Sequence, residues 1–136
     1  MTKKRQKHWE RVMSKAREGY SDVTYEDTWS LDSVLAGIIA KHLRAFLKSV
    51  KAFGSCPDSL TSKYGERGFE EWLNILRKMI YAFEEYNRKP EIRYDYEEEE
   101  RDEIAQQQWK AKEEERQMRI REGMQLFIDY YSDLWW

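Results

Sequence analysis

The segment Ser30–Phe53 reads SLDSVLAGIIAKHLRAFLKSVKAF, and its apolar residues recur at the period of an α-helix, about 3.6 residues. The apolar positions that follow this period are Val34, Leu35, Ile38, Ile39, Leu43, Phe46, Leu47 and Val50. Ser30 is a favourable N-cap residue, and Gly54 can end the helix because glycine readily adopts the left-handed conformation of a helix C-terminus. We therefore expect a long amphipathic helix with one face in the core.

A second helix is predicted from about Phe69 to Tyr86, because its apolar residues cover one broad face. These residues are Phe69, Trp72, Leu73, Leu76, Met79, Ile80 and Phe83. We expect a loop at Gly54–Gly68 before it, with one short helical turn around Ser59–Tyr64. Asn87 is expected to end the helix in the left-handed conformation, with Pro90 as a further barrier. This second helix is the best candidate for the centre of the fold.

The segment Glu97–Leu134 contains no proline and a single glycine, Gly123, so one long helix is predicted there. Its C-terminal half has an apolar stripe that we expect to face the core, formed by Ile120, Met124, Phe127, Ile128, Tyr131, Leu134 and Trp135. Its N-terminal half offers only Ile104 and Trp109 among charged residues and glutamines. That half is expected to project, to fray or to meet a partner.

The last seven residues, Tyr130 to Trp136, include four large aromatic side chains. Burial of two aromatic side chains stabilises a fold by several kcal/mol, at about 25 cal/mol per Å². We therefore expect the end of the chain to dock against the helices or against a ligand or partner.

The N-terminal segment is basic, with seven lysines and arginines against two acidic residues between Met1 and Glu18. A helix over Lys3–Arg17 would place Trp9, Val12, Met13 and Ala16 on one side, and Gly19 would end it. The acidic residues between Asp95 and Glu103 could attract this basic segment, or both could simply be solvated.

Together these patterns predict an all-α protein with three main helices around an aromatic core. A long, charged C-terminal helix protrudes in part, and a basic N-terminal helix precedes the rest. The 136 residues are expected to form a single helical domain, with residues 1–20 as a basic N-terminal segment. Because Ile104 and Trp109 would be poorly covered in one chain, we also expect a homo-oligomer.

The composition disfavours several partners. The net charge is −2, so no overall field attracts nucleic acid or a membrane surface. No apolar run is long enough to cross a bilayer, and no export signal is recognisable, so we expect neither membrane nor nucleic acid as a partner. The single cysteine, Cys56, fits a reducing cytoplasm.

Catalytic machinery is difficult to assemble from this sequence. The only thiol is Cys56 and the only histidines are His8 and His42, and His42 lies on the apolar stripe of the first long helix, where we expect a half-buried structural histidine. A Cys56–His42 dyad is a minor alternative. The common zinc, dinucleotide and phosphate-loop motifs are missing, so neither a metal nor a cofactor is expected, and an enzyme is less expected than a binding protein.

A magnesium site on facing helices remains an open alternative. The carboxylates that it would use are Glu70, Glu71, Glu84, Glu85, Glu97, Glu100 and Asp102. They lack a second paired motif inside a helix, so a solvated acidic face is the simpler interpretation.

Acidic and aromatic residues converge at Tyr25–Asp32, just before the first long helix. Free backbone N–H groups at a helix start suit an anion such as phosphate, and aromatic rings can stack on a base. We therefore select Tyr25 and Trp29 as stacking residues and Asp32, Arg44 and Lys78 as the other candidate ligand-binding residues, of which Arg44 and Lys78 supply positive charge. The alternative is structural: Trp29 packs beside the helix start and Asp32 balances the helix dipole.

Three motifs carry a family resemblance: DTWSLD at 27–32, WLNILRKMIYAFE at 72–84 and GMQLFIDYYSDLWW at 123–136. Together they resemble small all-helical accessory proteins of tailed bacteriophages and prophages, over residues 21–136. The resemblance implies a phage protein that acts in the cytoplasm of a bacterial host. It carries over no catalytic residue.

Some phage accessory proteins bind nucleotide-derived immune signals of the host without cleaving them. By analogy, the leading hypothesis is a sponge that sequesters a small anionic, nucleotide-like ligand. An alternative is a protein-interaction module that docks on and inhibits a host or phage protein. A third is a magnesium-dependent nucleotide hydrolase.

Overall fold

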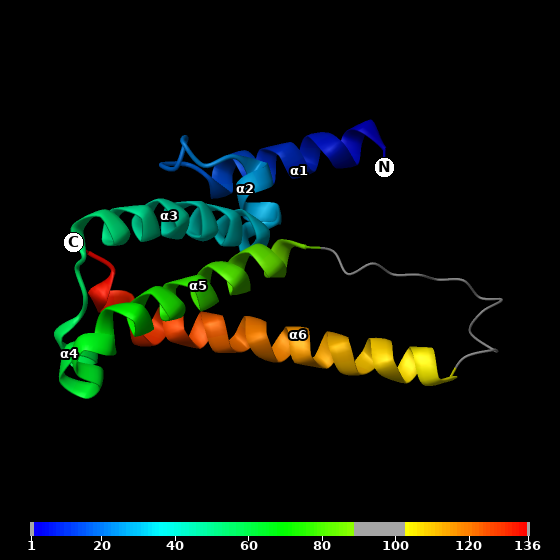
Figure 1. The fold of residues 1–136 in the computed structure, drawn as a ribbon. Helices are drawn as coiled ribbons and strands as arrows, with labels where there is room; N and C mark the ends of the chain where they lie inside the picture. Colours follow the sequence, from blue (N-terminus) through cyan, green and yellow to red (C-terminus); the bar gives the residue numbers. More distant parts are fainter. Residues whose placement is uncertain (1, 89–102, 136) are drawn as a thin grey trace. The chain divides into compact units, whose positions relative to one another are not determined.

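The computed structural model describes residues 2–88 and 103–135, apart from the side chain of Tyr25. Every regular element in these ranges is a helix, which confirms the all-α class (Figure 1). The elements are α1 (Lys3–Ala16), α2 (Tyr25–Trp29), α3 (Leu31–Phe53), α4 (Asp58–Tyr64), η1 (Gly65–Arg67), α5 (Gly68–Asn87), α6 (Glu103–Asp129) and η2 (Tyr131–Asp133). A search of the described residues finds no helix with the length and apolar character of a membrane span. The chain forms two compact units, Met1–Leu35 and Ala36–Trp136.

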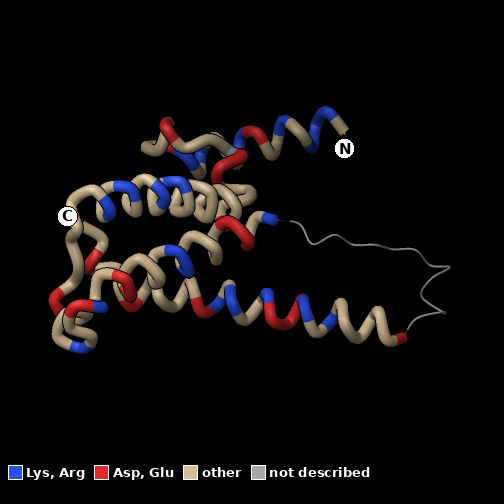
Figure 2. Tube along the Cα trace, viewed as in Figure 1, with Lys and Arg blue, Asp and Glu red and all other residues tan. Residues whose placement is uncertain are grey.

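In the first unit, α1 is the predicted basic helix (Figure 2). Thr2 is its N-cap, and the Thr2 hydroxyl accepts a hydrogen bond from the backbone N–H of Arg5 at 3.3 Å. After the helix, Gly19 has a φ of +91°, a conformation that favours glycine. Trp9 and Val12 on the apolar side of α1 are exposed.

Helix α2 was not predicted, because Tyr25–Asp32 looked like the approach to a single helix. Thr24 and Asp27 form a reciprocal capping box that starts a separate short helix. Asp27 N–H donates to the Thr24 hydroxyl at 3.2 Å, and Thr24 N–H donates to the Asp27 carboxylate at 3.0 Å. The Ser30 carbonyl then accepts the first bond of α3, from Val34 N–H at 3.0 Å.

Helix α3 matches its prediction to within one residue at its start, and Gly54 follows it with a φ of +69°. Its buried residues in the second unit are Ala36, Ala40, Leu43 and Val50. The prediction that Ile38 faces the core is wrong, because 49% of its surface is exposed. His42 is also exposed, where a half-buried histidine was predicted. Helix α3 is apolar around more of its circumference than one packing face uses.

Helix α4 confirms the helical turn predicted in the loop before α5. Gly68, the first residue of α5, lies against α4, since a Cβ there would come within 2.9 Å of the Leu60 carbonyl oxygen. In the interior of α5, Trp72, Leu76 and Met79 are all at most 1% exposed. The prediction that this helix is central to the core is therefore confirmed.

The predicted left-handed cap of α5 at Asn87 is wrong. Asn87 is the last helical residue and Arg88 is extended, with φ −76° and ψ 119°. The carbonyls at this helix end are instead bound by a side chain from α6. Arg116 Nη2 donates to the backbone oxygen of Glu85 at 2.6 Å and to that of Arg88 at 2.9 Å. Pro90 lies outside the described residues.

Helices α5 and α6 pack closely in antiparallel directions (Figure 1). The side of α6 that faces α5 carries Arg116, Ile120, Gly123 and Phe127, and Tyr130, just after the helix, continues their spacing of four and three residues. A Cβ at Gly123 would overlap the Lys78 carbonyl oxygen and the Ala82 Cβ, so only glycine permits this approach.

Two predictions about the C-terminal helix are corrected. The helix ends at Asp129, not at Leu134, and the chain continues through a turn at Tyr130 into η2. The predicted core stripe is rotated as well, because Ile128, Tyr131 and Trp135 are 67%, 66% and 75% exposed. The packing face is set by the glycine, which a count of large apolar residues overlooks. The predicted helical residues 97–102 lie outside the described residues.

Aromatic rings from distant parts of the chain meet in the core, as predicted. The Trp72 ring on α5 lies 6.4 Å from that of Phe46 on α3 and 5.6 Å from that of Tyr130 after α6. A second series runs outward from Phe83 to Phe127, with ring centres 5.0 Å apart, and on to Tyr131 at 5.6 Å. Three helices therefore share one aromatic core.

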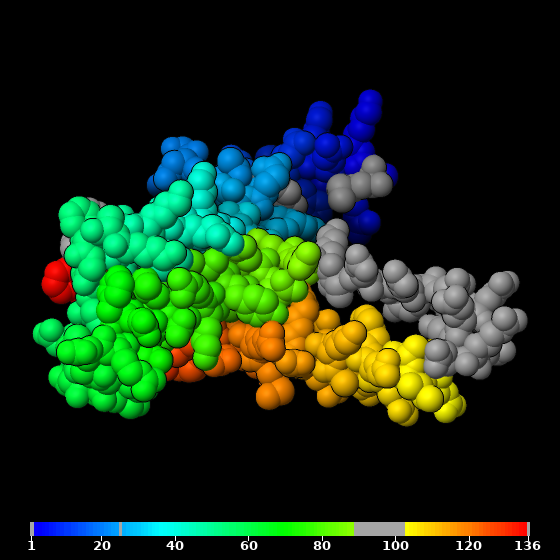
Figure 3. All heavy atoms as spheres, in the orientation of Figure 1, coloured from blue at the N-terminus to red at the C-terminus, as the bar shows by residue number. Residues whose placement is uncertain are grey.

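The two ends of the C-terminal segment differ in burial. The first turns of α6, residues 103–112, are exposed throughout, including Ile104 and Trp109 (Figure 3). At the other end, Tyr130 and Leu134 pack against the core, which confirms that this part of the chain end is docked. Trp135 is exposed, and Trp136 lies outside the described residues.

Candidate functional site

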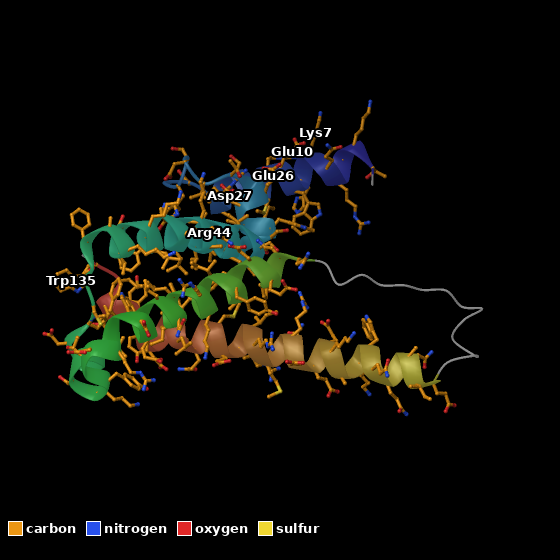
Figure 4. All side chains as sticks on the ribbon, in the orientation of Figure 1. Lys7, Glu10, Glu26, Asp27, Arg44 and Trp135 are labelled. Carbon is orange, nitrogen blue, oxygen red and sulfur yellow. The ribbon has the colours of Figure 1, made fainter. Side chains whose placement is uncertain are left out.

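The predicted ligand-binding residues fall on both units. Trp29, at the end of α2, is 76% exposed, and Asp32 is exposed in the first turn of α3, in the first unit. Tyr25 opens α2, and its side chain lies outside the described residues. Arg44 on α3 (Figure 4) and Lys78 on α5 belong to the second unit.

Both candidate cations already have carboxylate partners. Arg44 donates hydrogen bonds to both carboxylate oxygens of Glu84, the second from Nη2 at 2.8 Å. These bonds raise the pKa of Arg44 and lower that of Glu84. Lys78 Nζ lies 3.0 Å from a carboxylate oxygen of Glu122 on α6. Arg44 therefore joins α3 to α5 while Lys78 joins α5 to α6, and each cation is less available to an anionic ligand.

The helix starts near Trp29 carry acidic side chains where an anion was expected. Glu26 and Asp27 lie in the first turn of α2, and Asp32 lies in that of α3. Hydrogen bonds from Thr24 lower the pKa of Asp27 (Figure 4), so its carboxylate stays charged. These carboxylates already balance the positive helix ends, and they would repel a phosphate.

The residues considered for nucleophilic chemistry have structural roles. The Cys56 thiol is half-buried and donates to the Pro57 carbonyl at 3.6 Å, and burial, followed by the nearby Asp58 charge, raises its pKa. His42 Nδ1 lies 2.7 Å from the Ile38 carbonyl oxygen of its own helix. Neither arrangement activates a nucleophile.

The carboxylates considered for magnesium are dispersed or already paired. Glu84 binds Arg44, and Glu85 binds Arg116 with an N–O distance of 2.8 Å. Within residues 2–88 and 103–135, no three histidine, cysteine or acidic residues form a group that could hold a metal ion. Glu97, Glu100 and Asp102 lie outside the described residues.

The second unit has an open apolar groove that sequence reasoning missed. Its volume is about 450 Å³, and we call it the α3 groove. Its lining residues are Ile38, Ile39, His42, Leu43, Ala45, Phe46, Ser49, Phe127 and Leu134. None of them carries a permanent charge, so the groove suits apolar side chains better than an anion.

A sequence signal for this groove did exist. The residues of α3 that line it follow the same period as the core residues, but on the adjacent side of the helix. The prediction of a single apolar stripe on α3 did not separate the side that packs in the core from the side that lines the groove. The contribution of Phe127 and Leu134 could not be predicted, because it depends on where α6 ends.

Comparison of the chain with protein-family models, with curated proteins and with solved structures finds no match in any of the three.

Proposed function

We propose that this protein is a non-enzymatic interaction module that binds another polypeptide through the α3 groove. The observation that carries the proposal is an open, uncharged groove next to further exposed apolar side chains. Ile38 is 49% exposed within the groove, and Tyr131 beside Phe127 is 66% exposed. Contiguous exposed apolar surface in a water-facing protein is typical of protein-binding sites.

The chemistry of the charged side chains supports the same proposal. Arg44, Lys78 and Arg116 are already paired with carboxylates of neighbouring helices. A nucleotide-like ligand would have to compete with these carboxylates. Sequestration of such a ligand stays a prediction, with less support than polypeptide binding.

The resemblance to phage accessory proteins gives this proposal a context. If the chain acts in the cytoplasm of an infected bacterium, its partner would be a host protein, a phage protein or a further copy of the chain. This context rests on the three sequence motifs alone.

The test uses the full chain as bait in a bacterial lysate, beside two variants. Ala45→Glu adds a negative charge in the groove, and Lys51→Glu replaces a positive charge with a negative one on another side of the same helix, outside the groove residues. Both positions are exposed, so both variants should fold. We expect Ala45→Glu to lose the bound protein, or to lose self-association where the partner is a further copy of the chain. Lys51→Glu should retain the same binding. Equal behaviour of the two variants would contradict the proposal.

A thermal-shift screen with linear and cyclic nucleotides checks the sponge hypothesis in parallel. A ligand at 100 times its Kd stabilises the fold by roughly 2.7 kcal/mol, which is easily measured. A shift that persists in Ala45→Glu and disappears in a Trp29→Ala variant would favour nucleotide binding over the function proposed here.

A further inference from the structure

The groove side of α3 has the spacing of a helix-binding surface. Its residues are Ile38, His42, Ala45, Ser49 and Ala52, which we call the α3 seam. They are separated by four, three, four and three residues, the heptad spacing with which one α-helix packs along another. All are exposed except the half-buried Ser49, and none carries a permanent charge.

The polar side chains of the seam are turned back onto their own helix. His42 Nδ1 lies 2.7 Å from the Ile38 carbonyl oxygen, and Ser49 Oγ donates to the Ala45 carbonyl oxygen at 3.3 Å. Because a carbonyl oxygen only accepts, the histidine bond requires a proton on Nδ1. One hydrogen-bonding group of each side chain is therefore satisfied within α3 before any partner arrives, which lowers the cost of covering the seam.

The seam also has a size gradient. Its large residues, Ile38 and His42, come first, and its small residues, Ala45, Ser49 and Ala52, follow. Two antiparallel copies of α3 would place Ile38 opposite Ser49 of the second copy and His42 opposite Ala45 of the second copy. Every large residue then meets a small one. A parallel pair would set Ile38 against Ile38 and alanine against alanine, which separates the helices at one end and leaves a void at the other.

The apolar wall beside the seam favours the same arrangement. Phe127 and Leu134 form the wall of the α3 groove on one side, while the exposed Lys41 and Lys48 flank the seam on the other. A two-fold axis across antiparallel helices joins apolar wall to apolar wall. It also brings the lysines of the two copies together at the rim, where water and salt screen their repulsion.

We propose that the α3 groove binds a second copy of this chain, with the two α3 helices antiparallel and the two-fold axis between His42 and Ala45. This inference rests on the proposed function, in which the groove binds a polypeptide, and it identifies that polypeptide. The homo-oligomer expected from Ile104 and Trp109 then has its contact on α3 and not on the start of α6.

Cysteine cross-linking in a Cys56→Ser background tests the arrangement. Ala45→Cys lies beside the proposed axis, so two copies should couple through a short bis-maleimide. Ala52→Cys lies far from the axis and should remain uncoupled, whereas a parallel dimer would couple both. A mixture of Ile38→Cys and Ser49→Cys chains should give the mixed product. Failure of Ala45→Cys to couple, or equal coupling of Ala52→Cys, would overturn the proposal.

Sedimentation equilibrium of the unmodified chain supplies a second measurement. We expect a dimer that Ala45→Glu weakens by about 100-fold, because a large side chain replaces the small one that faces His42 of the second copy. Lys51→Glu should leave the dimer intact. Higher salt should tighten the dimer several-fold, because it screens Lys41 and Lys48. If the chain stays monomeric at 100 times the bait concentration of the lysate experiment, the proposed dimer is contradicted. If the chain is monomeric and Ala45→Glu still fails to bind a lysate protein that the unmodified chain binds, the proposed function stands without the dimer.

Discussion

At the scale of single residues, a close approach between two helices depends on a glycine. Helices α5 and α6 approach at Gly123, where an added Cβ would overlap the Lys78 carbonyl oxygen and the Ala82 Cβ. Backbone cannot move aside as a flexible side chain can. The approach therefore fixes how far apart the two helices lie and which side of α6 faces the core.

Gly123→Ala is expected to reduce the free energy of unfolding by about 3 kcal/mol, because the helices must separate to admit one methyl group. Gly37→Ala is the matched control on α3. Its added Cβ would have as its nearest neighbour the Asn87 side-chain nitrogen at 3.6 Å, an ordinary contact. The free energy of unfolding of Gly37→Ala should rise by up to about 1 kcal/mol, because alanine has a higher helix propensity than glycine. Urea unfolding of the two variants measures the difference, and a neutral Gly123→Ala would disprove the close approach.

The ion pair between Arg44 and Glu84 predicts a pH dependence. Hydrogen bonds from Arg44 lower the pKa of Glu84 below its ordinary value of 4.5. A carboxylate with a lowered folded-state pKa stabilises the fold above pH 4.5, and this contribution is lost as the pH falls through the folded-state pKa. Glu84→Gln should therefore be less stable than the unmodified chain near pH 7, and the gap should close in acid. A gap that widens in acid would contradict the assignment.

At the scale of helices, many boundaries were predictable because they depend on local chemistry. Gly54 ends α3, α4 forms where a short helical turn was predicted, and α5 begins close to where its apolar period starts. The end of α5 was predicted to within one residue, but its left-handed cap was not formed, because Arg116, from a distant part of the chain, binds the carbonyls there. No reading of local propensity detects such a contact.

Arg116 ties two helices together, so its loss should be costly. Its side chain is 15% exposed, and it donates to the carboxylates of Glu85 and Glu113 as well as to the end of α5. Arg116→Met is expected to lower the free energy of unfolding by about 3 kcal/mol, because several half-buried acceptors lose their donor at once. Arg119→Met removes an exposed pair with Glu115 and should change stability by less than about 0.5 kcal/mol. Thermal unfolding of both variants measures the two losses of stability. Similar losses in the two variants would show that Arg116 has no special role.

At the scale of the whole molecule, the gathering of aromatic residues was predicted but their division between core and surface was not. Trp72 is 1% exposed, whereas Trp9, Trp29, Trp109 and Trp135 are all more than half exposed. The helical period identifies which apolar residues share a face, but it does not predict whether side chains from other helices cover that face. The same limit hid the α3 groove, which is visible only once α6 ends at Asp129 and the chain turns back.

Tryptophan fluorescence should reflect this division. Emission of the folded chain is expected at long wavelength, because exposed indoles dominate it, with a weaker blue component from Trp72. Trp72→Phe should remove the blue component and cost about 2 kcal/mol of stability through the smaller ring. Trp9→Phe, at an exposed helix position, should change neither the blue component nor the stability. A blue component that survives Trp72→Phe would refute the burial of this side chain.

The antiparallel pairing of α5 and α6 also bears on how quickly the second unit can fold. Arg116 and Glu85 are 31 positions apart, and Phe46 and Trp72, at the meeting point of three helices, are 26 apart. Closing loops of this length costs modest chain entropy, and helical folds with such short-range topology typically form within milliseconds. Nascent chains would accordingly spend little time with their many aromatic rings open to aggregation.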